Sequence, residues 1–267
     1  MTLLDDEVHA GWRLFRPLYA LAGAGTWLTR VGQLPGLYSD QSPLVESSKS
    51  PIAWPALAVY AWFAVLLAGF AAVAMNWNVR RAAACILVAQ VAFRVGSPDY
   101  IFMYDQLMLW QTVALLFHPD GAGRTPGSPL GRQLLTLTYV GMYAGTGLSK
   151  VARTTQWFIG QPLAAWLVDS HFAGGELARW ASVQAPLLAV MGTVTIMFEA
   201  GFPLALLHPW TRRAWLLAGI AMHLGILTLL EVHTFSFVAL AGYPMLVDGR
   251  WAAWLAEKWR GRGRGRR

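Results

Sequence analysis

The chain has few charged residues and almost no cysteine. Only 13% of its 267 residues are Asp, Glu, Lys or Arg, whereas a soluble domain usually carries about 25%. Together with a hydrophobic content of 56%, this deficit indicates that much of the surface faces lipid and not water. The single cysteine, Cys85, excludes an intrachain disulfide, and because it lies in an apolar run we expect it to be packed.

Common catalytic and metal-binding motifs are also missing. The sequence has no Walker loop, no dinucleotide fingerprint, no HExxH and no catalytic serine or cysteine motif. No Cys/His set has the spacing of a zinc site, so we expect no metal. The paired short or broken helices of inverted-repeat transporters are not evident, which ranks a small-molecule transporter lowest among the functions considered.

Long apolar runs dominate the sequence instead. A membrane-spanning helix needs ~20 mostly apolar residues, and helices keep their backbone hydrogen bonds internal in lipid. We therefore expect an all-α, multi-pass helix bundle in the cell (plasma) membrane, with about eight transmembrane helices. The runs are 11–31, 55–75, 80–97, 100–117, 132–152, 185–207, 213–230 and 233–248. Pro203 and Pro209 are expected to kink or end the sixth run.

Basic residues between the runs give an orientation. With the N-terminus inside, the inner segments contain fifteen Lys and Arg residues and the outer segments contain five. Since inner loops of membrane proteins are enriched in basic residues, we expect both termini inside. The net charge of +7 then reflects topology, and we expect no nucleic-acid partner.

Residues 1–248 are expected to form a single transmembrane domain, followed at 249–267 by an interfacial amphipathic segment and a basic cytoplasmic tail. An apolar face of the segment carries Trp251, Trp254 and Trp259, which is typical of a helix lying on a membrane surface. The tail from Arg260 onward is expected to attract anionic lipid, at ~1 kcal/mol per basic residue, with RNA binding as the alternative.

Two outer loops, residues 32–54 and 153–184, are long enough to fold over the bundle, and loops of this length are usually functional or disordered. The second loop contains an amphipathic segment from Trp157 to Val168. Its aromatic residues favour an interfacial or re-entrant segment over a free linker; they are Trp157, Phe158, Trp166 and Trp180.

The fifth run has a polar face that ends in a lysine. Tyr139, Tyr143, Thr146 and Lys150 are spaced by four, three and four residues, so they share one side of a helix. Lys150 has two interpretations. Its amine is removed from water and can act as a base, or its side chain extends to the membrane surface and keeps the ammonium in water. A neighbouring face of small residues is expected to let another helix approach closely; it consists of Gly141, Gly145 and Ser149.

Other ionisable residues lie in or near the runs, where they are costly and mark candidate functional sites. Arg94 and Asp105 are expected to pair across the hairpin between the third and fourth runs, either as a structural ion pair or as part of a site. Glu199 and His223 are expected to be close enough to form a hydrogen-bonded pair, with a proton relay as the alternative. The orientation places six of these residues near one depth, namely Arg94, Asp99, Asp105, Lys150, Glu231 and His233.

Several of these segments combine into a pattern that extends over about residues 10–248. In order, they are Leu37-Tyr38-Ser39-Asp40, Arg94, Tyr104-Asp105-Gln106-Leu107, Tyr139 to Lys150, Trp157, Gly160, Glu199 to Pro203, His223-Leu224 and Phe235-Ser236. The pattern resembles the horizontally transferred transmembrane domain family. That family includes the membrane part of vitamin K-dependent γ-glutamyl carboxylase and the membrane subunit that matures a bacterial sporulation-delaying peptide toxin.

The resemblance implies a mechanism and a set of site residues. In the carboxylase a lysine deprotonates reduced vitamin K, oxygen converts the vitamin to a strong base that attacks glutamate, and carbon dioxide adds. Lys150 matches that lysine, so a reduced quinone is the cofactor that the resemblance implies. The expected catalytic residues are Lys150, Asp105 and His233, and the expected substrate or lipid contacts are Arg94, Tyr139, Tyr143, Trp157, Glu199 and His223. The carboxylase has a histidine in the polar hairpin where this chain reads Phe102-Met-Tyr-Asp-Gln106.

Two classes of function follow. The first is a membrane enzyme, or an enzyme subunit, that uses a quinone-like lipid to modify an exported peptide or a small molecule. The second is a non-catalytic membrane partner, such as an accessory or immunity component for an exported peptide. Possible partners are therefore membrane lipid, an exported peptide and a partner subunit.

Overall fold

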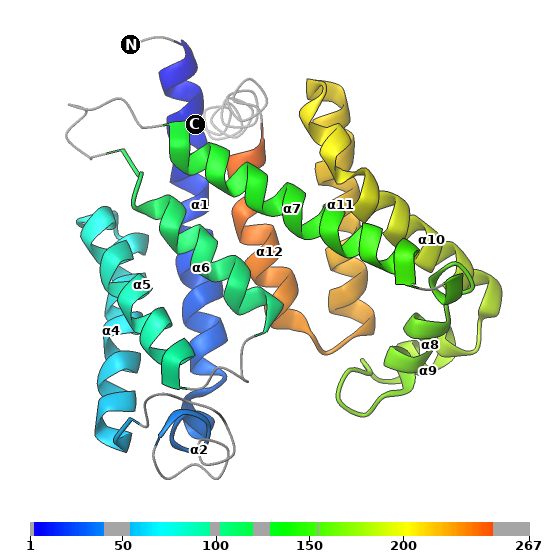
Figure 1. Ribbon diagram of the computed structural model, residues 1–267, viewed down its shortest axis with the longest axis horizontal. Helices are drawn as coiled ribbons and strands as arrows, with labels where there is room; N and C mark the ends of the chain where they lie inside the picture. The colour runs from blue at the N-terminus through cyan, green and yellow to red at the C-terminus, as the bar shows by residue number, and fades with distance from the viewer. Residues whose placement is uncertain (1–2, 40–53, 97–101, 120–128, 154, 248–267) are drawn as a thin grey trace, which may run out of the picture. The chain divides into compact units, whose positions relative to one another are not determined.

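Helices make up all of the regular structure in the ranges that the computed structural model describes, which are residues 3–39, 54–96, 102–119, 129–153 and 155–247 (Figure 1). These ranges also contain two isolated β-bridges, Ser39–Trp54 and Ala173–Leu230. Each of the eight predicted runs coincides with a helix. The all-α class is therefore confirmed, whereas the predicted amphipathic segment and basic tail at 249–267 lie outside the described residues.

Two helical segments in the described ranges are long and apolar enough to cross a membrane, judged by length and composition. The first is α4 (Ala56–Ala74), and the second is α10 (Ala185–Gly201) with the 3₁₀ helix η4 (Phe202–Leu206) that continues it. The regular α-helix ends at Gly201, two residues before Pro203, as the sequence predicts, because proline has no backbone N–H to continue the helical hydrogen bonds.

The chain divides into two compact units, residues 1–135 with 241–267 and residues 136–240. The helices of the first unit are α1 (Leu3–Leu28), η1 (Val31–Gln33), α2 (Leu34–Tyr38), α4, α5 (Val79–Gly96) and α6 (Met103–Leu115), with the beginning of α7 (Pro129–Arg153) and the end of α12 (His233–Leu246). Helix α4 packs between α1 and α5, and α5 also packs against α6.

A buried polar chain links three helices of the first unit. The Tyr19 hydroxyl of α1 lies 2.5 Å from the Thr112 hydroxyl of α6, which lies 3.0 Å from the Gln90 side-chain oxygen of α5. All three side chains are buried. Because an unpaired polar group in such an interior is costly, these contacts fix how α1, α5 and α6 face one another.

Cys85 is exposed on α5, so the expectation that it is packed was wrong. The buried positions of α5 recur every three or four residues, at Ala82, Ile86, Ala89 and Phe93. Cys85 lies to one side of that stripe, and an apolar neighbourhood in the sequence does not distinguish the two sides of a helix.

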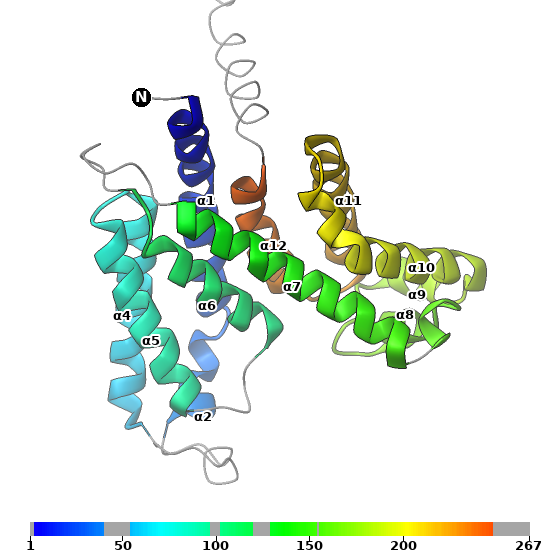
Figure 2. The same cartoon turned by 45° about the horizontal axis from the view of Figure 1, so that its top comes forward.

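The second unit contains the remainder of α7 and α12 together with η3 (Thr155–Trp157), α8 (Gln161–Val168), α9 (Glu176–Ser182), α10, η4 and α11 (Pro209–Leu229). Figure 2 shows α8 and α9 gathered beside the beginning of α10, and both short helices contact α10.

Glycines allow several backbones of this unit to approach closely. A Cβ atom added to Gly147 of α7 would lie 2.8 Å from the Glu199 Cβ of α10, and one added to Gly192 of α10 would overlap the Trp157 carbonyl oxygen. The predicted small-residue face was wrong in its position, because a Cβ at Gly141 or Gly145 would lie in open space, with no atom of another described helix within 4 Å. The close approach occurs at Gly147, which lies on the side of α7 that contains Lys150.

Candidate functional site

The strongest candidate site is an ion pair between α7 and α10 in the second unit. The Lys150 Nζ lies 2.6 Å from Oε1 and 2.5 Å from Oε2 of Glu199, so the amine binds both carboxylate oxygens. The two side chains are 17% and 10% exposed, which means that both charges are largely removed from water. A buried charge pair persists only when its geometry is good, because each ion loses several kcal/mol of solvation.

An aromatic side chain completes the surroundings of the amine. The Lys150 Nζ lies 4.4 Å from the centre of the Trp157 ring, within the range of a cation–π interaction. Trp157 is itself held in place, since its carbonyl packs against Gly192 and its ring lies 5.3 Å from the ring of Trp166 on α8. The lysine is therefore positioned from two directions, by a carboxylate and by an indole face.

A second polar layer lies further along the same face of α7. The Tyr143 hydroxyl is 2.7 Å from His223 Nε2, and His223 Nδ1 is 3.3 Å from the Ser236 hydroxyl. The three side chains are buried, and Tyr143 packs against the rings of Phe198 and Phe202. This layer joins α7, α11 and α12 through side chains that can both donate and accept hydrogen bonds.

The prediction that Glu199 pairs with His223 was wrong. Glu199 pairs with Lys150, whereas His223 binds Tyr143 and Ser236. Lys150 and Tyr143 are seven residues apart, which is about 10 Å along a helix, so Glu199 and His223 meet α7 at different levels. The predicted common face of α7 is nevertheless occupied by polar contacts, including a 2.6 Å hydrogen bond from the Tyr139 hydroxyl to the Ala239 carbonyl.

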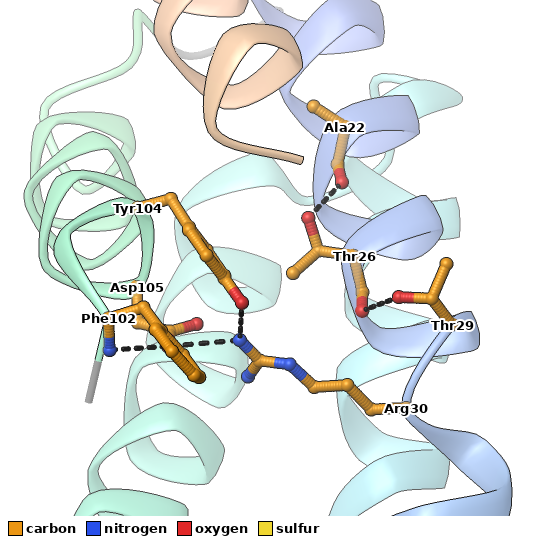
Figure 3. A network of polar contacts seen from close by, with 7 residues as sticks. All are labelled: Ala22, Thr26, Thr29, Arg30, Phe102, Tyr104 and Asp105. Atoms are coloured by element: carbon orange, nitrogen blue, oxygen red, sulfur yellow. Dashed lines mark hydrogen bonds and ion pairs between the residues drawn. The ribbon is translucent and has the colours of Figure 1, made fainter. Parts of the chain in front are cut away.

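A separate cluster in the first unit surrounds Arg30, which lies just after α1. Its Nη2 donates to the Tyr104 hydroxyl at 2.6 Å and to Asp105 Oδ2 at 3.0 Å, and Figure 3 shows the guanidinium reaching toward both groups. Its guanidinium carbon lies 5.2 Å from the Trp27 ring centre and 5.1 Å from that of Tyr104. Asp105 Oδ2 also accepts the backbone N–H of Phe102 at 3.1 Å, which caps the start of α6.

The predicted ion pair between Arg94 and Asp105 was wrong. Asp105 pairs with Arg30, and Arg94 Nη1 donates to the Gln106 side-chain oxygen at 2.6 Å. Sequence reasoning counted Arg30 only as a charge in an outer loop. The aromatic residues at 27, 102 and 104 offered a signal, but nothing in their spacing shows that they meet.

Tyr38, part of the predicted motif after the first run, lies near this cluster. Its ring packs 4.8 Å from that of Phe93 and 6.1 Å from that of Trp27. Burial raises the pKa of Tyr38 to about 12, so its hydroxyl stays protonated and serves as a neutral hydrogen-bonding group.

Glu231 and His233 lie where α11 gives way to α12, as predicted, and both are exposed. No hydrogen bond or ion pair joins His233 to Lys150 within the described residues. Asp99 lies outside them. The predicted gathering of six ionisable residues at one depth involves both units and stays a prediction. Among the described residues, no group of three or more His, Cys, Asp or Glu side chains could hold a metal ion.

No protein-family model, curated protein or solved structure matches the chain. The class that the geometry defines is therefore an all-α protein with two segments able to cross a membrane and a buried Lys–Glu pair in one unit.

The close contact at Gly147 predicts that Gly147→Ala destabilises the second unit. The new methyl group would meet the Glu199 backbone and push α10 away from Lys150, at about 1–3 kcal/mol for an overpacked contact. The free energy of unfolding, measured by denaturant titration in mixed detergent micelles, checks this. Gly141→Ala is the matched control on the same helix and should be neutral or slightly stabilising. Equal effects of the two substitutions would contradict the packing described here.

Proposed function

We propose that the chain is a multi-pass protein of the cell membrane, with about eight transmembrane helices and both termini inside, and that it is a member of the horizontally transferred transmembrane domain family. Three observations support the proposal. Each predicted run is helical, two segments have the length and composition of membrane spans, and basic residues are concentrated in every other connection.

The orientation predicts opposite labelling of two turns. In a Cys85→Ala background, a membrane-impermeant maleimide should label Glu231→Cys in intact cells and Trp77→Cys only in inverted vesicles. Both positions are exposed, so differences in labelling report the side of the membrane. Labelling of both positions from the same side would exclude the proposed topology.

We further propose that the protein is a membrane enzyme, or an enzyme subunit, in which Lys150 is the general base. The observation that carries this proposal is the contact of the Lys150 amine with both oxygens of Glu199 in surroundings largely removed from water. A lysine that only reached toward the membrane surface would place its ammonium in water, whereas the Lys150 amine lies over the face of the Trp157 ring.

The pair can move a proton without creating a net charge. When the ammonium proton passes to Glu199, the products are a neutral amine and a neutral carboxylic acid, and removal from water favours neutral groups. The amine can then accept a proton from an acidic hydroxyl of a bound substrate. The resulting ammonium becomes the counter-ion of the substrate anion, while the carboxylic acid at Glu199 stays neutral. Charge and protons balance at each step.

The residues around Lys150 suit a flat, lipid-soluble molecule with an acidic hydroxyl. The amine and the carboxylate bind polar groups, and the Trp157–Trp166 pair provides aromatic surface beside them. A reduced quinone, which the family resemblance implies, would supply such a hydroxyl and electrons for a reaction with oxygen. The modified product would then be an exported peptide or a small molecule.

If Lys150 is the base, its removal should abolish quinol-dependent oxygen uptake. Purified protein with a reduced naphthoquinone should consume oxygen above the rate of the free quinol, and Lys150→Ala should lower this rate by about 100-fold or more, in line with general-base catalysis. Arg179→Ala, which removes an exposed basic residue of α9, is the control and should leave the rate unchanged.

Unchanged oxygen uptake in a folded Lys150→Ala protein would exclude the role of Lys150 as a base. The absence of uptake by the native protein would exclude a quinol oxidation step. Either result would favour the second class of function, a non-catalytic membrane partner in which the ion pair only cross-links α7 to α10.

A further inference from the structure

We propose that α8 and α9 form an interfacial cap, which lies in the headgroup region of the bilayer and places one aromatic face among the lipids. This inference rests on the membrane location proposed above, but it does not depend on catalysis. It assigns a lipid-binding surface to the outer side of α8 and α9, of which the proposed chemistry uses only Trp166.

Neither helix of the cap can cross a membrane. Helix α8 has eight residues and α9 has seven, so at ~1.5 Å per residue they are about 12 Å and about 10 Å long. The hydrocarbon core of a bilayer is about 30 Å thick. Short helices of this length must lie at the membrane surface, in water or within the protein.

Backbone hydrogen bonds attach the cap to the end of α11, and the chain itself connects the cap to the beginning of α10. The Gly174 N–H donates to the Leu229 carbonyl at 3.0 Å, and the Glu231 N–H donates to the Phe172 carbonyl at 2.9 Å, so the segment between α8 and α9 is bonded to the chain at the end of α11. Helix α9 also leads directly into α10, which begins at Ala185. Since α10 and η4 form a candidate membrane span, the beginning of α10 marks the level of a bilayer surface.

One side of the cap is packed onto the protein. Leu167 of α8, Ala178 and Ala181 of α9, and Leu188 of α10 form a buried apolar cluster, against which Leu229 and Leu230 also pack. This side fixes the depth of both helices relative to α10 and leaves their other sides free for a partner.

The outer side of α9 separates apolar from charged residues. Leu177 and Trp180, three residues apart and therefore on one face, are 51% and 57% exposed. Glu176 and Arg179, also three residues apart, form an ion pair on the neighbouring face. A short helix with an exposed tryptophan beside a charged stripe fits the boundary between headgroups and acyl chains, because indole rings favour that region while charges remain in water.

Helix α8 extends the apolar surface toward Lys150. Trp166 is 40% exposed and packs on Trp157, whose ring lies beneath the Lys150 amine. The cap therefore connects to the ion pair through two indole rings in edge-to-face contact.

Depth-dependent quenching tests the cap. In a Cys85→Ala background, single cysteines at Trp180→Cys and Arg179→Cys are labelled with a bimane probe, and the protein is placed in phosphatidylcholine–phosphatidylglycerol vesicles. Spin labels are carried by the headgroup, by the upper acyl chain or by the lower acyl chain of the lipid. Probes at neighbouring residues of one short helix differ mainly in the face on which they lie, so Arg179→Cys is the matched control.

The cap predicts that headgroup and upper-chain labels quench the probe at residue 180 at least twofold more than the probe at residue 179. Leu177→Cys, on the same face as Trp180, should repeat the result if the tryptophan is needed for folding. Weak and equal quenching at 177, 179 and 180 would overturn the proposal in favour of water. Weak quenching with disulfide cross-linking between Trp180→Cys copies would overturn it in favour of a second copy of the chain. Strongest quenching by lower-chain labels would overturn it in favour of a deeply re-entrant segment.

The experiment needs no substrate and no activity. Failure of the cap would therefore leave the role of Lys150 open to its own test, and loss of that role would leave the cap unaffected.

Discussion

The contact between the Lys150 amine and the Glu199 carboxylate is the interaction on which the second unit depends, because two charges removed from water must stay together. Their separation of 2.5–2.6 Å requires α7 and α10 to approach closely, and Gly147 permits that approach. Trp157 covers the amine, and Gly192 gives space to the Trp157 backbone. Removing one partner of such a pair leaves an unpaired charge that is largely removed from water, which is strongly destabilising.

The two units contain the same kind of ion pair, but the two cations differ in their chemistry. Each contains a largely buried cation paired with a carboxylate and covered by aromatic rings, Arg30 with Asp105 in one unit and Lys150 with Glu199 in the other. A guanidinium stays charged under all ordinary conditions, so the Arg30 cluster can bind and orient groups but cannot transfer a proton. An amine can lose its proton when it is removed from water. This difference is the reason that we propose chemistry at Lys150 and not at Arg30.

The sequence predicted those features of the fold that depend on neighbouring residues alone. The positions of the helices follow from apolar runs, the end of α10 follows from Pro203, and the polar face of α7 follows from its helical spacing. The ion pairs and hydrogen bonds between helices could not be predicted from spacing. Spacing shows which side chains share a face of one helix, but it does not show which other helix packs against that face. The sequence does not show that Asp105 meets Arg30 and not Arg94. It also does not show that Glu199 meets Lys150 and not His223, because that depends on how far along each helix the residues lie. Gly147 was likewise indistinguishable from Gly141 and Gly145.

Nitrogen NMR of the lysine side chains tests the ion pair most directly. The chain contains three lysines, Lys49, Lys150 and Lys258, so protein labelled with ¹⁵N at the lysine Nζ gives few resonances, and the Lys150 signal is assigned by its loss in Lys150→Met. If Glu199 holds the amine as described, Glu199→Gln shifts the Lys150 resonance and leaves the signals of the other two lysines in place. An unchanged Lys150 resonance in the folded Glu199→Gln protein would contradict the account.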